Sequence, residues 1–163
     1  MRAIILSDSH GDQKACVRAV EASGKADMII HLGDIERDVK FLRELYSSIP
    51  VYSVIGNNDF FINGNTEAVV EFADNKIFLC HGHTNGVRSG TSGLEIAAKK
   101  AGCNIALFGH THKPLIKNSN GILIINPGSV AYPRFGSPSF AILEYMEDGS
   151  EEDVKGIIVD WVL

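Results

Sequence analysis

The sequence predicts an α/β protein in which two mixed β-sheets pack together with helices on their outer faces. Two observations support this fold class. In the first third of the chain, short apolar runs alternate with segments of helical periodicity, as in a βαβαβ unit with a parallel sheet. Later, paired apolar segments flank tight turns, which indicates β-hairpins. Apolar residues make up 45% of the 163 residues, so we expect one domain over residues 1–163.

The βαβαβ unit is expected to occupy residues 3–55. Three short apolar runs at 3–6, 28–30 and 51–55 each end at polar residues or glycine, as strands buried on both faces do. Asp12 can cap the first helix, which carries Cys16, Val17, Ala19 and Val20. The second helix places Ile35, Val39, Leu42 and Leu45 near the 3.6-residue period.

The remaining elements are mostly hairpins. Residues 68–72 and 76–80 flank Ala73-Asp74-Asn75, and residues 115–116 and 122–125 flank Asn120-Gly121, a preferred hairpin turn. Between them, Ser92 and Glu95 have the spacing of a capping box, Gly102 can end that helix, and residues 105–108 form a buried strand. The last two strands, 140–145 and 156–161, are expected to connect through Asp148-Gly149.

Charge and composition narrow the functional classes. The formal charge of −5 argues against coating nucleic acid or anionic membrane by charge alone, but it leaves room for a small positive site. No apolar run approaches the roughly 18 residues of a membrane-spanning helix, and the run before Asp8 is too short for a signal peptide. Cys16, Cys80 and Cys103 are widely spaced and are expected to be small buried hydrophobes. We therefore expect a cytoplasmic protein without membrane contact.

Five apolar strands end in Asp, Asn or His next to glycine, and this is the main functional signal. The clusters are Asp8-Ser9-His10, Gly33-Asp34, Gly56-Asn57, His81-Gly82-His83 and Gly109-His110-Thr111-His112. Ligands of α/β sheets bind beyond the carboxyl ends of strands, so these side chains are expected to converge. In extended backbone, residues i and i+2 share a face, which would direct both donors of Asp8/His10 and of His110/His112 the same way. Oxygen and imidazole donors without thiolate suit Mn, Fe, Zn, Ni, Co or Mg.

This ordered set of clusters resembles the calcineurin-like metallophosphoesterases. The resemblance extends from the first strand to about Phe140, and the short chain with Asn126-Pro127-Gly128-Ser129 is most similar to the small prokaryotic phosphodiesterases of that superfamily. It implies a four-layer α-β-β-α sandwich. It also implies a phosphoesterase with two divalent metal ions, for which we expect Mn, with Ni, Fe, Zn, Co or Mg as alternatives.

The resemblance assigns roles to individual residues. It implies that one metal ion is held by Asp8, His10 and His112, the second by Asn57, His81 and His110, and that Asp34 bridges both. In such a site a bridging water becomes hydroxide near neutral pH and attacks phosphorus in line. The expected substrate is a small phosphodiester. A phosphomonoesterase or a nuclease is the alternative, although long nucleic acid is disfavoured by the lack of a basic stripe.

A non-catalytic alternative also exists. The retromer coat subunit uses the same fold as a scaffold in which the site is altered, whereas this sequence keeps every ligand position, which favours an enzyme. Hydrolysis of an aryl phosphodiester with added Mn²⁺, compared with EDTA, discriminates between the two.

Asn58 departs from the family pattern, in which a histidine commonly follows Gly-Asn, contacts phosphate and protonates the leaving group. An amide can hydrogen-bond to phosphate but cannot act as a general acid near neutral pH. With Asp34, Asn58 and His81 as the expected catalytic residues, we therefore predict a preference for esters with good leaving groups, such as aryl phosphodiesters.

The other candidates each have a structural alternative. His83 and Arg134 are expected to contact the substrate. The alternative for His83 is structural support of the site, and the alternative for Arg134, as for Arg88, is a solvated surface charge. His31 is expected to be hydrogen-bonded near the core, and Asn126 and Ser129 to shape the wall of the site. Phe60 and Phe61 line either the substrate entrance or a homo-oligomer contact. The loops at 63–67 and 87–91 are expected to set specificity.

Overall fold

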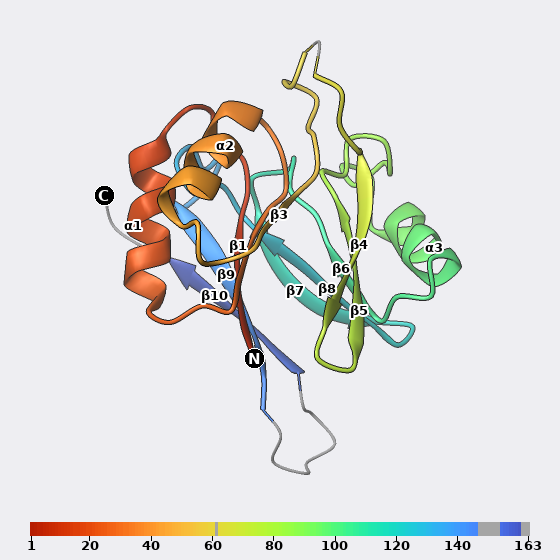
Figure 1. The fold of residues 1–163 in the computed structure, drawn as a ribbon. Helices are drawn as coiled ribbons and strands as arrows, with labels where there is room; N and C mark the ends of the chain where they lie inside the picture. The colour runs from red at the N-terminus through yellow and green to blue at the C-terminus, as the bar shows by residue number, and fades with distance from the viewer. Residues whose placement is uncertain (61, 147–153, 161–163) are drawn as a thin grey trace.

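Two five-stranded sheets pack face to face in the computed structural model, which describes residues 1–60, 62–146 and 154–160 (Figure 1). The first sheet contains, in spatial order, β10 (Val154–Asp160), β9 (Ser139–Tyr145), β1 (Arg2–Leu6), β2 (Met28–His31) and β3 (Val51–Ser53). The second contains β4 (Glu67–Phe72), β5 (Asn75–Cys80), β6 (Ile105–Leu107), β8 (Ile122–Pro127) and β7 (Pro114–Ser119). Both sheets are mixed. In the first, β1, β2 and β3 pair in parallel and β9 is antiparallel to β1. In the second, β4 and β5 are antiparallel, whereas β5, β6 and β8 are parallel.

Helices cover the outer faces of both sheets. The helices α1 (Gln13–Ser23) and α2 (Glu36–Leu45) lie on the first sheet, and α3 (Ser92–Lys100) lies on the second. Strand β1 shows how the layers form, because successive side chains of a strand point to opposite faces. Ile5 is buried between the two sheets, whereas Ile4 is buried against the helical layer. The four-layer α-β-β-α prediction is confirmed.

Several local predictions are confirmed as well. Asp12 caps α1 by accepting a hydrogen bond from the backbone N–H of Ala15 at 2.9 Å. Asn120 and Gly121 connect β7 to β8 with φ values of 52° and 78°, as a two-residue hairpin turn requires. The three cysteines are buried and free. None of the described helices is long and apolar enough to cross a membrane. Asp148-Gly149 and Trp161 lie outside the described residues.

Other local predictions are wrong. Helix α2 begins at Glu36 rather than Ile35, and Leu45, expected on its apolar face, is 50% exposed. Asp38 is buried instead, because its carboxylate has hydrogen-bond partners in the loop after β1. Strand β3 ends at Ser53, two residues early. The β4–β5 turn has two residues rather than three, since Phe72 pairs with Asn75.

The predicted capping box of α3 is not formed. The residue before the helix is Thr91, and Glu95 accepts hydrogen bonds from the Thr91 hydroxyl at 2.8 Å and from Asn120 Nδ2 at 2.9 Å. Lys117 Nζ lies 3.5 Å from the same carboxylate. Glu95 therefore connects α3 to the β7–β8 hairpin instead of reaching back to a backbone N–H. Gly102 follows the helix with φ 70°, as predicted for its end.

Candidate metal centre

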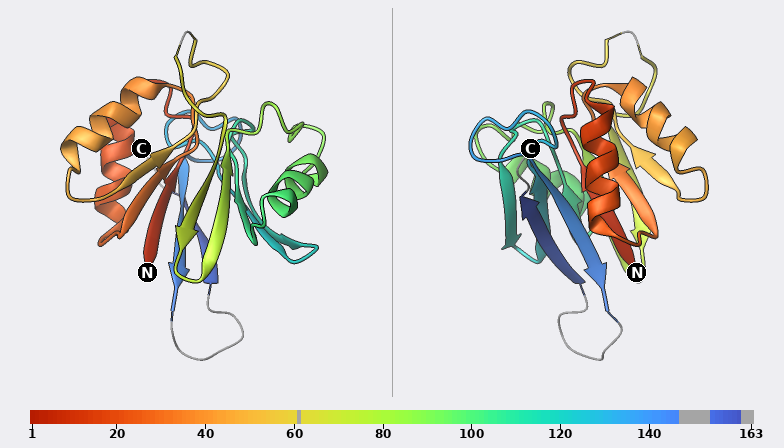
Figure 2. Two further views of the ribbon diagram at one scale, coloured as in Figure 1. Left: turned by 45° about the vertical axis from the view of Figure 1, so that its right-hand side comes forward. Right: turned by 90° about the vertical axis from the view of Figure 1, so that its left-hand side faces the viewer.

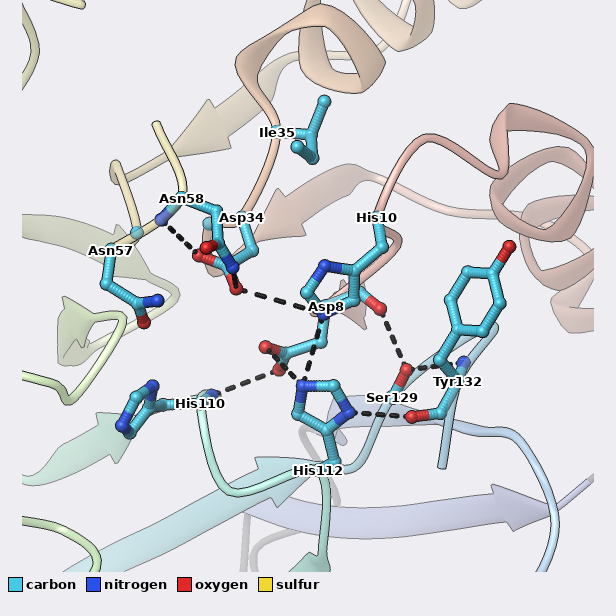
Figure 3. Close-up of polar contacts among 12 residues, drawn as sticks. Asp8, His10, Asp34, Ile35, Asn57, Asn58, His110, His112, Ser129 and Tyr132 are labelled. Atoms are coloured by element: carbon cyan, nitrogen blue, oxygen red, sulfur yellow. Dashed lines mark hydrogen bonds and ion pairs between the residues drawn. The ribbon is translucent and has the colours of Figure 1, made fainter. Parts of the chain in front are cut away.

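The loops after β1, β2, β3, β5 and β6 meet at one end of the sandwich (Figure 2). They bring together side chains predicted as ligands: Asp8, His10, Asp34, Asn57, His81, His110 and His112. Figure 3 shows Asp8, His10, Asp34 and His112 directed toward a common centre. The predicted convergence at the carboxyl ends of strands is therefore present.

The backbone conformation behind this convergence differs from the prediction. Extended backbone was expected at residues 8–10 and 110–112, but five of the candidate ligands have left-handed φ angles. These are Asp8 (55°), His10 (47°), Asp34 (65°), His110 (65°) and His112 (57°). Such a conformation costs about 1–2 kcal/mol per residue outside glycine. Concentrated at one place, it indicates loops shaped to aim side chains rather than to minimise local energy.

Asp8, His10 and His112 form the first donor group. His112 Nε2 lies 3.2 Å from Asp8 Oδ1 and 3.2 Å from His10 Nε2. His112 Nδ1 donates to the carbonyl of Tyr132 at 2.6 Å, so in the neutral imidazole the lone pair of Nε2 faces Asp8 and His10. Acceptor atoms held this close together are stabilised by a cation among them.

His81 lies at the centre of the second donor group. Its Nδ1 donates to the carbonyl of Leu32 at 2.7 Å, and its Nε2 lies 3.4 Å from Asp34 Oδ1 and 3.1 Å from Asn57 Oδ1. Two carboxylates reach between the groups. Asp8 Oδ1 is 3.9 Å from His81 Nε2, and Asp34 Oδ2 is 3.8 Å from the Nε2 of His10. The ligand atoms thus fall into two sets, Asp8–His10–His112 and Asp8–Asp34–His81.

A buried carboxylate oxygen of Asp8 tests whether this centre fits a cation. Asp8 Oδ2 accepts hydrogen bonds from Ser7 Oγ and the backbone N–H of His110, but Oδ1 is buried and has no hydrogen-bond partner among the described residues. Burial raises the pKa of Asp8, but the contacts with His112 and His81 outweigh it and leave that pKa below its ordinary value. A charged, buried oxygen that lacks a hydrogen bond and faces imidazole nitrogens fits a divalent ion.

His110 and Asn58 lie in the centre but make other contacts. The ring of His110 lies 5.1 Å from that of His81, outside the two compact ligand sets. Burial, together with the charges of His81 and Arg88, lowers the pKa of His110 to about 4, so its imidazole is neutral near pH 7. Asn58 donates to the carboxylate of Asp34, from Nδ2 at 2.7 Å and from its backbone N–H at 3.1 Å.

Besides Asn58, the other two predicted substrate contacts lie near the centre. The ring of His83 is 5.5 Å from that of His81 and 6.2 Å from that of His110, and burial lowers its pKa. His83 Nδ1 is buried without a partner among the described residues. Arg134 is exposed, and its charge acts on His112. Phe60 is 69% exposed, and Phe61 lies outside the described residues.

Sequence reasoning missed the role of Asp59. Its carboxylate accepts hydrogen bonds from four backbone N–H groups: Gly56 (2.7 Å), Asp34 (3.2 Å), Ile35 (2.9 Å) and Glu36 (2.7 Å). It therefore joins the loop that carries Asp34 to the loop that carries Asn57 and caps α2, whose own preceding residue is an isoleucine. An acidic residue directly after Gly56-Asn57-Asn58 was the available signal.

Asp38 supports the loop between Asp8 and His10. Its Oδ2 accepts from Ser9 Oγ at 2.7 Å and from the backbone N–H of Gly11 at 2.8 Å. Ser9 Oγ also lies 3.1 Å from His31 Nε2, and burial lowers the pKa of His31. His31 is thus hydrogen-bonded near the core, as predicted.

Asn126 and Ser129, which were predicted to shape the wall of the site, form hydrogen bonds to its loops. Ser129 Oγ donates to the backbone carbonyl of Asp8 at 2.8 Å, and Asn126 Nδ2 donates to that of Gly109 at 2.9 Å. Glycine is required at Gly56 and Gly109, since a Cβ there would overlap Asp34 and Ser7, respectively.

Known proteins match both the sequence and this architecture. A sequence model of the calcineurin-like phosphoesterase superfamily domain matches residues 1–148. The chain belongs to that superfamily. Among its relatives, the probable metallophosphoesterase YsnB of Bacillus subtilis is 31% identical over 153 residues, covering 92% of this chain and 88% of YsnB. Phosphodiesterase MJ0936 of Methanocaldococcus jannaschii is 28% identical over 178 residues, covering 98% of this chain and all of MJ0936.

Solved structures share the fold of this chain. A predicted phosphoesterase from Streptococcus pneumoniae is 28% identical, with a TM-score of 0.77 and 97% of both chains covered. Wild-type Vps29 of Entamoeba histolytica, solved in complex with zinc, is 26% identical, with a TM-score of 0.73, covering 98% of this chain and 99% of Vps29.

Proposed function

We propose that this calcineurin-like phosphoesterase hydrolyses small phosphodiesters with two divalent metal ions. Asp8, His10 and His112 would hold one ion and Asn57, His81 and His110 the other, with Asp34 between them. The observation that carries the proposal is the buried Oδ1 of Asp8. It has no hydrogen-bond partner among the described residues and faces two imidazoles whose Nδ1 atoms are engaged by backbone carbonyls. Relatives named as phosphodiesterases support the reaction class.

When bound, such a pair of ions supplies a hydroxide nucleophile from water near pH 7 and neutralises charge on the phosphate oxygens. The protein's own residues position and orient the ligand atoms. The Tyr132 and Leu32 carbonyls hold the His112 and His81 rings in place, which keeps both Nε2 atoms aimed at the carboxylates. Asn58, already 2.7 Å from Asp34, would donate a hydrogen bond to a phosphate oxygen but supplies no proton to the leaving group.

We expect Mn as the metal, with Ni, Fe, Zn, Co or Mg as alternatives. The donor set of carboxylate, imidazole and amide oxygen suits all of these ions, and zinc is bound in the related Vps29 structure. The three buried free cysteines support a reducing cytoplasmic setting.

The proposal is tested by hydrolysis of bis(p-nitrophenyl) phosphate. Protein freed of metal with EDTA should be inactive and should regain turnover with Mn²⁺. The variants Asp34→Asn and His81→Ala should lose at least about 100-fold in kcat/KM, more than the loss of a group that only orients a ligand. Lys99→Met, an exposed change on α3, is the control.

Two results would contradict the proposal. Full metal-dependent activity in Asp34→Asn or His81→Ala would exclude this centre, and no turnover with any of the metals would favour a non-catalytic scaffold. A series of aryl diesters tests Asn58 within the same assay. Because no general acid assists, the wild-type rate should fall steeply as the pKa of the leaving group rises, and a flat dependence would contradict that assignment.

A further inference from the structure

A cleft of about 590 Å³ lies directly beside the candidate metal centre. Thr111, which stands between His110 and His112, lines its inner end. The loop at 87–91 and the start of β7 form its sides, and Arg134 and Phe135 reach it from the segment before β9. We call it the cationic cleft. Its volume is in the range of small-molecule sites.

The charge of this cleft opposes that of the chain. Arg88, Lys113 and Arg134 line it and no acidic residue does, although the chain has 20 acidic and 15 basic residues. None of the three cations has a carboxylate within salt-bridge distance in the part of the chain that the structure describes. Lys113 Nζ instead lies 4.7 Å from the centre of the Phe135 ring. Uncompensated cations gathered in one concave place match an anionic ligand.

The cleft also has apolar walls. Val87 and Phe108 are buried beneath it, and Leu115 lines it from β7. The Phe135 side chain, which also lines the cleft, is 69% exposed. Apolar walls and an exposed aromatic ring favour a flat ring system, which can stack on Phe135 while the cations hold its charged group.

The cleft adjoins the metal centre. Thr111 lines the cleft, and the residues on either side of it, His110 and His112, are predicted ligands at the centre. A ligand bound at the centre can therefore extend along Thr111 into the cleft. A second cleft of about 570 Å³, at the other end of the sheets, contains both Asp74 and Lys155 and lacks this one-sided charge.

We propose that the cationic cleft is a second subsite for the substrate, and that the substrate is a phosphodiester carrying both a flat ring and a second phosphate, as nucleotides with an additional phosphate do. The reacting diester occupies the metal centre, the ring packs against Phe135 and the apolar wall, and the second phosphate binds Arg88, Lys113 and Arg134. The choice of ester that is cleaved rests on the proposed phosphodiesterase function, whereas the binding of the ring and the second phosphate does not.

Two substrates that differ in one phosphate test this subsite. Thymidine 5′-(p-nitrophenyl phosphate) and its 3′-phosphorylated form share the leaving group and the nucleoside. With Mn²⁺, the 3′-phosphorylated form should have a kcat/KM at least about tenfold higher, since a hydrogen bond to a charged group contributes about 1.5–3 kcal/mol. Arg88→Met and Arg134→Met should each abolish most of this preference, because each should raise KM for the 3′-phosphorylated substrate more than KM for the unphosphorylated one. Lys99→Met, which removes one positive charge outside the cleft, should keep the preference.

A binding measurement separates the subsite from the reaction. Calorimetry on protein kept metal-free with EDTA should show thymidine 3′,5′-bisphosphate binding about tenfold more tightly than thymidine 5′-phosphate. Arg88→Met should remove the difference, Arg88→Lys should retain part of it, and Phe135→Ala should weaken both ligands because the ring contact is lost.

The outcomes distinguish the two proposals. Bisphosphate binding in the cleft without any hydrolysis would overturn the proposed function and leave the subsite standing. If the two substrates were hydrolysed with equal kcat/KM, the subsite would be excluded and the phosphodiesterase function would remain. The same would follow if wild type bound the two ligands equally tightly, as Arg88→Met is expected to do.

Discussion

The chain reverses direction in different ways at the two ends of the sandwich. At the end opposite the metal centre, β4–β5 and β7–β8 turn within two residues, and the positive φ angles fall on Ala73, Asn120 and Gly121, where a short hairpin requires them. At the centre, left-handed residues carry the functional side chains themselves, and the loops are held by Asp59, Asp38 and Ser129 from other parts of the chain.

This difference separates stability from function within one fold. The hairpin turns obey local rules, so changes there should affect the free energy of unfolding and leave chemistry intact. The loops at the centre depend on contacts between distant residues, so changes there should affect activity more than stability. The left-handed conformations at Asp8, His10 and Asp34 cost conformational energy, but they bring the ligand atoms together. Such strain is typical of functional sites, where the geometry of the site matters more than local stability.

The largest contrast is expected between two glycine substitutions. In Gly56→Ala, the new Cβ would overlap Asp34, displace its carboxylate and lower kcat/KM by up to about 100-fold, the upper end of the range for a lost ligand-orienting group. In Gly121→Ala, no heavy atom lies within 4 Å, and the φ of 78° should cost only about 1–2 kcal/mol of stability. Steady-state kinetics and urea denaturation of both variants check this. Equal losses of activity would erase the distinction between the two ends.

A smaller contrast is expected between two aspartates at helix N-termini. In Asp59→Asn, an NH₂ group would face N–H donors that the carboxylate now accepts, so we expect a loss of about 2 kcal/mol and about tenfold in kcat/KM. Asp12→Asn makes the same change at α1, where only one capping bond is involved and asparagine caps as well as aspartate. Thermal unfolding and kinetics should show Asp12→Asn close to wild type. If the two variants matched, Asp59 would be an ordinary helix cap.

The smallest effect is expected at Glu95, which connects α3 to the hairpin turn far from the centre. Hydrogen bonds from Asn120 and Thr91 lower the pKa of Glu95 from 4.5 to about 2. The resulting stabilisation is complete above pH 4.5 and is lost as the pH falls toward 2. Glu95→Gln should therefore lower Tm at pH 7, and the difference from wild type should shrink between pH 4.5 and 3, with kcat/KM unchanged. Glu71→Gln on β4 is the control, and a Tm difference independent of pH would contradict this interpretation.

The same division explains what could be predicted from the sequence. Apolar runs, Asn120-Gly121 and Asp12 act over a few residues, so the strands, a turn and a cap could be placed from local patterns. Convergence of Asp8, Asp34 and His81 could also be predicted, because parallel strands present their carboxyl ends at the same edge. The left-handed backbone at the centre and the four hydrogen bonds of Asp59 could not, since they depend on loops that approach one another only after the sheets pack.

Ser129 has a consequence for the order in which the protein is made. Its hydroxyl donates to the carbonyl of Asp8, a partner 121 residues earlier in the chain. During translation, every donor of the centre up to His112 therefore leaves the ribosome before the residue that anchors the first loop. A truncated chain that stops before Ser129 contains the whole set of donors without this anchor, so a ribosome-bound fragment has the composition of the centre but not its geometry.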